Sequence, residues 1–296
     1  MTQVALRFQI GARTLASVDR SLVRVPCQID DVIAGRSPVL PPTEGDGYLI
    51  TSLPERLLGA IDTGGRIASV RQRYDRFHTD FALGHTAWLQ GLSSNARSTI
   101  KRKTRKIAQA SGGILDIRAY RTPDDFAVFH PIARSVSAKT YQEKLLDAGL
   151  PAAGASLASL CELAAADRVR AWLLFLGGEP IAYLCCTAHR DALLYTYVGH
   201  DPAHNDLSPG TVLQAEAMRD SFDDRFRWFD FTEGEGQHKK LFSTGSTRCL
   251  DLLLLRPTIA NRVTVISLAA FDRGVALAKR GATHPRIKSF AKRMRR

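Results

Sequence analysis

The chain has few of the residues and segments that mark a secreted, membrane-spanning or zinc-binding protein. Its 296 residues include five cysteines, and no two of them form a C-x-x-C pair, which argues against both a disulfide framework and a zinc site. No run approaches the roughly eighteen apolar residues of a spanning helix, and the N-terminus has no signal-peptide pattern. We therefore expect a cytoplasmic protein with reduced, mostly buried thiols, in which Cys185 and Cys186 face opposite sides of a strand.

Acidic residues are scarce in two segments that hold the whole surplus of positive charge. Residues 97–106, RSTIKRKTRK, contain six basic residues and no acidic one. Residues 256–296 contain eleven basic residues against the single acid Asp272. Since the formal net charge is +12, the rest of the chain is mildly acidic, and anion binding is expected to be local.

The hydrophobic pattern predicts a mixed α/β protein. Residues 1–84 alternate short apolar runs with Pro/Gly-rich turns, which indicates a small subdomain. A helix is predicted around residues 96–110, with Ile100, Thr104 and Ile107 on its docked face and its basic residues on the other. Three apolar runs at 169–176, 181–189 and 192–199 predict a buried antiparallel meander. Ser208 and Pro209 then begin a second amphipathic helix.

One polar stretch attracts a catalytic interpretation. Residues 229–243 read FDFTEGEGQHKKLFS, which fits neither the P-loop nor the dinucleotide-binding glycine pattern. Metal ligation by Asp230, Glu233, Glu235 and His238 matches no known ligand spacing, so no metal is expected. The residues themselves leave two alternatives open: an acid/base and binding cluster, or a glycine-rich turn with solvated charges.

Four segments together resemble a known family. They are WLQGLSSNARSTIKRKTRK, GGEPIAYLCC, YTYVGHDPAHNDLSPGTVL and FDFTEGEGQHKKLF, and they span roughly residues 70–255. In this order they resemble the GNAT-fold acyltransferases called BioF-like or CelD-like, which are related to the FemAB aminoacyltransferases. The resemblance implies a GNAT-like, mainly antiparallel sheet flanked by helices, in a double-GNAT arrangement. The implied domains are a degenerate GNAT-like half (1–84), the acyltransferase domain (85–255) and a basic amphipathic helix with a tail (256–296).

The resemblance also implies a site. Asp230 and Lys239 match the family's pattern, whereas His238 stands where tyrosine is usual. The implied catalytic residues are Asp230, Glu233, His238 and Lys239, with Glu233 or His238 as the base and Lys239 as an anion anchor. The implied binding residues for the acyl-CoA donor are Ser208, Gly210, Thr211 and Tyr197, although the usual R/Q-x-x-G-x-G/A signature is absent and Pro209 removes one N–H donor.

From the residues themselves, Tyr195 and Tyr197 lie two apart on a predicted strand and are expected to share a face. They either line the acceptor groove or belong to the core with their hydroxyl groups in contact with water.

The implied function is N- or O-acyl transfer to a polar, anionic acceptor related to sugars, exopolysaccharide or the cell envelope. One alternative is a FemAB-like enzyme that uses aminoacyl-tRNA, and otherwise nucleic acid is not an expected partner, because few aromatic residues interleave with the basic helix. Another is a catalytically silent adaptor for a membrane surface or nucleic acid.

The C-terminal segment leaves two interpretations open. Ile259, Val263, Ile266, Ala270 and Leu277 form one apolar stripe edged by arginines. Residues 256–296 then either lie on an anionic membrane at its inner face or pack on the protein as a terminal helix with a basic end.

Overall fold

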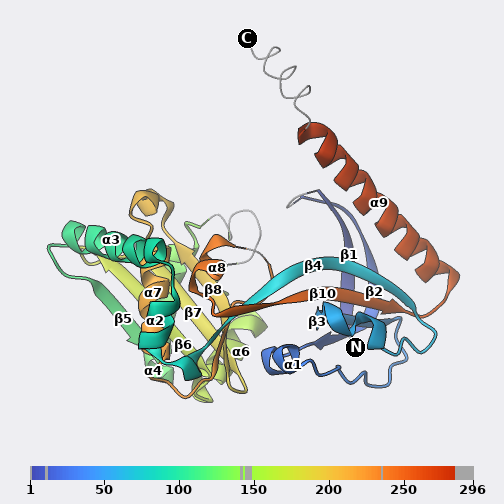
Figure 1. Cartoon of the computed structure of the whole chain (residues 1–296), viewed down its shortest axis with the longest axis horizontal. Coiled ribbons are helices and arrows are strands. Elements are labelled where there is room, and N and C mark those ends of the chain that lie inside the picture. Colours follow the sequence, from blue (N-terminus) through green and yellow to red (C-terminus); the bar gives the residue numbers. More distant parts are fainter. Residues whose placement is uncertain (1, 11–12, 141–142, 144–148, 235, 284–296) are drawn as a thin grey trace, which may run out of the picture. The chain divides into compact units, whose positions relative to one another are not determined.

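The computed structural model describes residues 2–10, 13–140, 143, 149–234 and 236–283. The chain forms two compact units, Met1–Arg73 with Cys249–Arg296 (unit 1) and Tyr74–Arg248 (unit 2). Strands β4 (Ile67–Asp80) and β10 (Gly245–Leu255) each cross from one unit to the other along the chain (Figure 1). The sequence-based division at 84/85 and 255/256 stays a prediction.

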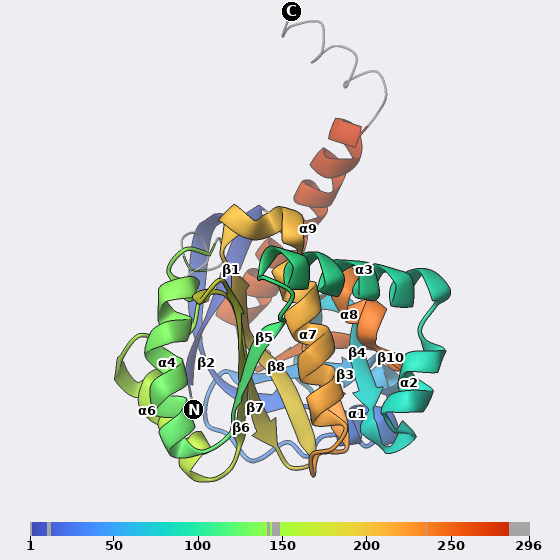
Figure 2. The ribbon, with the colours of Figure 1, turned by 90° about the vertical axis from the view of Figure 1, so that its left-hand side faces the viewer.

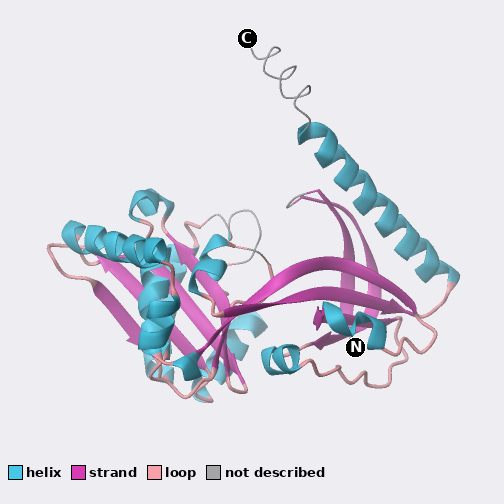
Figure 3. Ribbon diagram, in the orientation of Figure 1, coloured by secondary structure: helices cyan, strands magenta, loops and turns pink. Residues whose placement is uncertain are grey.

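Unit 1 is built on a curved sheet. Its strands are β1 (Thr2–Ile10), β2 (Arg13–Pro26), β3 (Gly47–Pro54), β10 and the first part of β4, in that order. β2 and β3 pair in parallel, whereas β1 with β2 and β3 with β10 are antiparallel. The short helices α1 (Ile29–Ala34) and η1 (Glu55–Ala60) lie in its connections, and the long helix α9 (Ile259–Thr283) follows β10 (Figure 3).

In unit 2 the same ten-stranded sheet continues in the order β4, β9 (Trp228–Asp230), β8 (Ala192–His200), β7 (Glu179–His189), β6 (Val169–Leu176) and β5 (Asp116–Tyr120). The predicted meander is confirmed, because β6, β7 and β8 pair antiparallel in sequence order. Gly177 and Gly178 make the tight turn between β6 and β7 at φ +57° and +87°, a conformation that glycine adopts without steric cost.

Helices cover both faces of the unit 2 sheet (Figure 2). On one face, α2 (His85–Gly91), α3 (Ser94–Ala110), α7 (Pro209–Ser221) and α8 (Gln237–Phe242) contribute to one apolar cluster. On the other, α4 (Pro123–Ser137) and α6 (Gly154–Ala165) contribute to a second. Cys186 belongs to the first cluster and Cys185 to the second, so the prediction that they face opposite sides is confirmed.

The thiols are structural. All five cysteines are unbridged and only Cys161 is exposed, which confirms the expected reduced state. Burial raises the pKa of Cys185 to about 12, and it raises the pKa of Cys186 as well. Neither thiol is therefore ionised near neutral pH.

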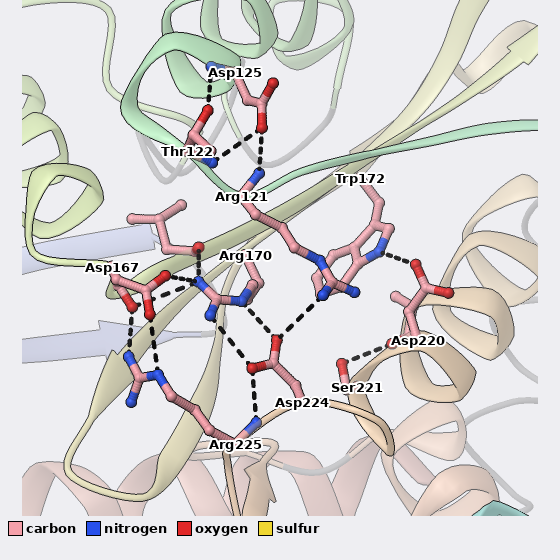
Figure 4. Close-up of polar contacts among 12 residues, drawn as sticks. Arg121, Thr122, Asp125, Asp167, Arg170, Trp172, Asp220, Ser221, Asp224 and Arg225 are labelled. Carbon is pink, nitrogen blue, oxygen red and sulfur yellow. Dashed lines mark hydrogen bonds and ion pairs between the residues drawn. The ribbon is translucent and has the colours of Figure 1, made fainter.

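Beyond the end of α7, a buried arginine ties the sheet to the segment that leads into β9. The Arg170 guanidinium on β6 donates to Asp224 from Nε (2.6 Å) and to Asp167 from Nη1 (2.7 Å), as Figure 4 shows. The side chains of Arg170 and Asp224 are 5% and 8% exposed, so the charges are satisfied by each other rather than by water. This network fixes both ends of the connection from α7 to β9.

Candidate functional site

Strands β8 and β9 diverge inside unit 2. They pair in parallel at only three positions, from Ala192 with Trp228 to Leu194 with Asp230. β9 ends there, whereas β8 continues to His200. The backbone beyond Leu194 therefore has no β9 partner at this edge, and a space opens between the sheet and α7.

That space is a hollow of about 420 Å³, named here the α7 hollow. Its walls come from β8, from the 3-10 turn η3 (Pro202–Leu207), from α7 and from α8. The residues that line it are Tyr195, Val198, Gly199, His200, Asn205, Ser208, Gly210, Thr211, Gln214 and His238. Three of the four predicted donor-binding residues (Ser208, Gly210 and Thr211) thus come together with one predicted catalytic residue, His238, which is 27 or more positions away in the chain.

The first turn of α7 faces this hollow without a side-chain cap. Ser208 and Pro209 occupy the N-cap and first helical positions, as predicted. Ser208 adopts a left-handed backbone (φ +55°) and its side chain makes no capping hydrogen bond. A helix start carries partial positive charge and N–H groups that seek an acceptor. A Cβ added at Gly210 would meet nothing closer than the His200 Nδ1, at 3.7 Å, so the glycine leaves open space for a ligand rather than relieving a clash.

Lys103 on α3 brings a cation to the same place. Its Nζ donates to the Thr211 Oγ1 at 3.1 Å. Burial, and then repulsion by Arg102, lower the pKa of Lys103. A second hollow of about 450 Å³, the α3 hollow, adjoins this contact and shares Thr211 and His238 with the α7 hollow. Its lining is Ser93, Asn95, Ala96, Thr99, Lys103, Thr211, Gln237, His238 and Leu241.

The α3 helix otherwise matches its prediction. Ile107 is fully buried and Ile100 packs against the same cluster. The exception is Lys103, which the sequence analysis placed with the solvated charges, whereas the structure places it half-buried beside α7. The signal was present, because residues 100, 103 and 107 fall on one face of a helix.

His238 stands between the two hollows. Its ring lies 5.7 Å from the Tyr195 ring, centroid to centroid, at an interplanar angle of 40°. Although solvent reaches the side chain, the protein atoms packed around the ring lower the pKa of His238, and the adjacent Lys239 charge lowers it further. The imidazole is therefore neutral at pH 7, the state in which it accepts a proton.

The prediction that Tyr195 and Tyr197 share a face is wrong. The β7–β8 register shifts between Cys185 and Cys186, which pair with Tyr197 and Tyr195 respectively. The bulge leaves Thr196 as the extra residue and breaks the two-residue alternation. Tyr195 consequently packs in the apolar cluster on the α7 side of the sheet, and Tyr197 packs in the cluster on the α4 side. Tyr197 therefore does not line the α7 hollow.

Asp230 and Lys239 are held inside the protein. The Asp230 carboxylate is 1% exposed and forms a two-pronged ion pair with Arg76, and its Oδ1 also accepts the Thr232 N–H at 2.9 Å. The Lys239 Nζ donates to the backbone carbonyl of Glu233, and burial lowers the pKa of Lys239 against the opposing attraction of Asp230 and Glu233.

The remaining acids of the stretch are placed less centrally. The Glu233 side chain is exposed and does not line either hollow. Glu235 lies outside the described residues. Within the part of the chain that the structure describes, no three His, Cys, Asp or Glu side chains come together as a metal site.

Gln214 is a lining residue that the sequence analysis missed. It is 3% exposed, and its Nε2 is buried without a hydrogen-bond partner among the described residues. A buried amide donor without an acceptor costs about 1–3 kcal/mol. Nothing in the sequence around Gln214 marks it as a residue that lines a hollow, so only the three-dimensional structure identifies it.

Residues 94–240 match the family model described as "Acetyltransferase (GNAT) domain". The C-terminal domain of a putative lysylphosphatidylglycerol synthetase from Agrobacterium fabrum is similar in structure, with a TM-score of 0.50, 9% identity, and coverage of 75% of this chain and 71% of that chain.

Two further structures are weaker matches. L-PGS from Bacillus licheniformis has a TM-score of 0.49, 11% identity and coverage of 75% of this chain and 71% of its own. FemX has a TM-score of 0.47, 10% identity and coverage of 69% and 71%. No curated protein sequence is significantly similar to the chain. The predicted α/β fold, with a mainly antiparallel sheet flanked by helices, is confirmed.

Proposed function

We propose that this chain, an acyltransferase whose residues 94–240 form an acetyltransferase (GNAT) domain, transfers an acyl group from acyl-CoA to the amine or hydroxyl of a polar acceptor. One observation carries the proposal: the uncapped start of α7, the Lys103 ammonium and the His238 imidazole meet where the α7 hollow and the α3 hollow adjoin. The start of α7 and Lys103 are suited to bind the phosphates of the donor, and His238 is suited to accept a proton. Acyl transfer from a phosphorylated thioester donor requires both.

The donor's phosphates are assigned to the first turn of α7. Gly210 and Thr211 line the hollow where the phosphates would approach the helix. Lys103 supplies a positive charge, and its hydrogen bond to Thr211 holds that charge in place. The Nε2 of Gln214, which has no protein acceptor among the described residues, would donate to a carbonyl oxygen of the bound donor after a small reorientation. Tyr197 is left out of this assignment because it packs with the cluster below α4.

His238 is assigned as the general base. The acceptor's lone pair attacks the thioester carbonyl carbon, the carbon–sulfur bond breaks, and the thiolate leaves. The proton that the acceptor loses passes to the neutral His238 ring. Its lowered pKa keeps the ring unprotonated at neutral pH, so it is ready to accept the proton without a prior ionisation. Glu233 is the rival base, and its exposed position outside both hollows disfavours it.

Asp230 and Lys239 are assigned to the support of the site rather than to the chemistry. Asp230 is neutralised by Arg76, and Lys239 holds the loop that ends at His238 by bonding to the Glu233 carbonyl.

For the acceptor we propose an anionic sugar or envelope component, as the family resemblance suggests. The supporting observation is the outer face of α3, where Lys101, Arg102 and Arg105 are exposed next to the α3 hollow. A negatively charged acceptor would be attracted to this side of the site. The same cations support the alternative donor, an aminoacyl-tRNA.

A thermal-shift experiment separates the candidates. A ligand that binds only the native state raises the melting temperature, and the rise grows with the ratio of its concentration to its dissociation constant. We expect acetyl-CoA or a longer acyl-CoA to stabilise the protein by several degrees, and free acetate to have no effect. Stabilisation by aminoacyl-tRNA and not by any acyl-CoA would contradict this proposal and favour an aminoacyltransferase. Stabilisation by neither would indicate the catalytically silent adaptor.

A further inference from the structure

Helix α9 turns polar residues toward its own unit. Asn261, Thr264 and Leu268 are 1%, 5% and 0% exposed. The Arg20 side chain on β2 donates from Nε to the Asn261 Oδ1 at 2.8 Å and from Nη2 to the Thr264 Oγ1. Further along, the Phe271 ring meets the Phe8 ring edge-on at 5.4 Å. The helix is thus attached to unit 1 by polar contacts near its start and, through Leu268, by an apolar cluster with residues of β1, β2 and β10.

The opposite side of α9 is apolar and uncovered. Ile259, Val263, Ile266 and Leu277 are 82%, 57%, 67% and 66% exposed. With the exposed Ala270 between them, they recur at spacings that keep them on one face of a helix. We name these five residues the outer stripe of α9. In Figure 1 the helix runs along the strands of its unit with one side free.

Helix α9 thus has an apolar side exposed to solvent in addition to the side that packs on unit 1. Burying one aliphatic side chain of this size stabilises by about 1.5–3 kcal/mol, and none of the four large ones is buried within the described chain. Scattered exposed aliphatic residues are ordinary, whereas a continuous stripe of them marks an interaction surface. The helix packs on unit 1 through its other side, and the stripe itself is available to a partner.

Charge decides which partner it fits. Residues 256–296 carry eleven basic residues and the single acid Asp272, and Asp272 is already paired with Arg71 at 3.1 Å. A second copy of the helix on the stripe would bring two strongly cationic segments together, which is unfavourable. An anionic lipid surface attracts the same charges while its acyl boundary accepts the aliphatic side chains.

We propose that the outer stripe of α9 docks on an anionic lipid bilayer, with the helix lying in the headgroup plane. Within the described residues, no helix is long and apolar enough to cross a membrane, and the stripe occupies one side of α9 only. Residues 284–296 lie outside the described residues, and they enter the argument through their charge alone. The proposal does not depend on acyl transfer.

The test is co-sedimentation of the full chain with vesicles of phosphatidylcholine alone and of phosphatidylcholine mixed with phosphatidylglycerol. The stripe variant is Ile266→Gln with Leu277→Gln. The matched control is Val39→Gln with Ile114→Gln, which changes residues that are 86% and 69% exposed elsewhere. We expect wild type and control to bind the anionic vesicles, and the stripe variant to bind at least about tenfold more weakly.

Several results would overturn the proposal. Equal binding by the stripe variant and the control would mean that charge alone acts. Equal binding to neutral vesicles would remove the role of anionic lipid, and absence of binding by wild type would remove the docking itself. If wild type is a dimer in the absence of vesicles and the stripe variant is a monomer, the stripe binds a second copy of the chain. Unchanged thermal melting and donor binding in the stripe variant confirm that it is folded.

Discussion

The ring of His238 lies against the ring of Tyr195, 5.7 Å away between centroids. Tyr195 is on β8 and His238 is on α8, so the contact joins the sheet to the short helix that follows the glycine-rich loop. This contact presents the imidazole to both hollows. It also packs the imidazole against an aromatic side chain of the sheet.

His238 is predicted to titrate below the ordinary histidine value of about 6.5. Burial and the charge of Lys239 both lower its pKa. Lys239→Met should therefore raise the His238 pKa toward the ordinary value. The measurement is the pH dependence of the His238 ring resonances by NMR, and the matched control is Lys240→Met, which removes an exposed charge from the same helix.

Catalysis gives a second observation on the same residue. If His238 is the base, the rate rises with pH through its pKa, and His238→Gln loses about a hundredfold or more in kcat. Glu233→Gln should stay near the wild-type rate. The reverse pattern, in which Glu233→Gln is inactive and His238→Gln is active, would assign the base to Glu233.

Lys103 is predicted to bind the donor. Its Nζ reaches Thr211 at the start of α7, and a charge-assisted hydrogen bond contributes about 1.5–3 kcal/mol. Lys103→Gln should weaken acyl-CoA binding by about tenfold or more and reduce its salt dependence. Lys101→Gln, an exposed position on the same helix, is the control. Equal effects of the two variants would reduce the role of Lys103 to general surface charge.

Gln214 should show effects of opposite sign on stability and on binding. Replacing it by leucine removes a buried Nε2 that has no acceptor among the described residues, so the ligand-free protein should gain about 1 kcal/mol of unfolding free energy. If the donor satisfies that group when bound, the same variant binds acyl-CoA more weakly. Chemical denaturation and calorimetry measure the two effects, and a variant that binds as tightly as wild type contradicts the assignment.

Asp230 is predicted to act on stability. Asp230→Asn leaves the Arg76 charge buried without its counter-ion, which should lower the unfolding free energy by about 3 kcal/mol. Asp31→Asn, which removes an exposed pair with Arg36, should cost less than about 1 kcal/mol. A stable Asp230→Asn protein with lost turnover would instead make Asp230 catalytic.

The sequence predicted the parts of this structure that depend on local pattern. The meander, the opposite orientation of Cys185 and Cys186 and the start of α7 at Ser208 and Pro209 follow from alternation and capping rules, and they were confirmed. Alternation failed at Tyr197, because a bulge depends on the partner strand and leaves no mark in the local sequence. The outer stripe of α9 was found as a pattern, but which face of a helix packs inward depends on tertiary partners such as Arg20.

The site was predicted in part for the same reason. Ser208, Gly210, Thr211 and His238 came from motif positions and do meet at one hollow. Lys103 and Gln214 belong to helix faces that the sequence assigned to solvent or to the core, and only the contact of α3 with α7 brings them to the site. Asp230 and Glu233 lie in the motif, but the Arg76 pair and the exposed loop give them other positions.

The central claim is that the α7 hollow binds acyl-CoA, and calorimetric titration of Gly210→Val tests it most directly. The valine side chain would enter open space next to His200 and occupy the proposed donor site, while Gly91→Val adds the same side chain at a position of unit 2 where a Cβ meets nothing within 4 Å. We predict that wild type and Gly91→Val bind one acyl-CoA per chain, and that Gly210→Val binds at least about tenfold more weakly at unchanged melting temperature. Equal affinity in all three proteins would contradict the account.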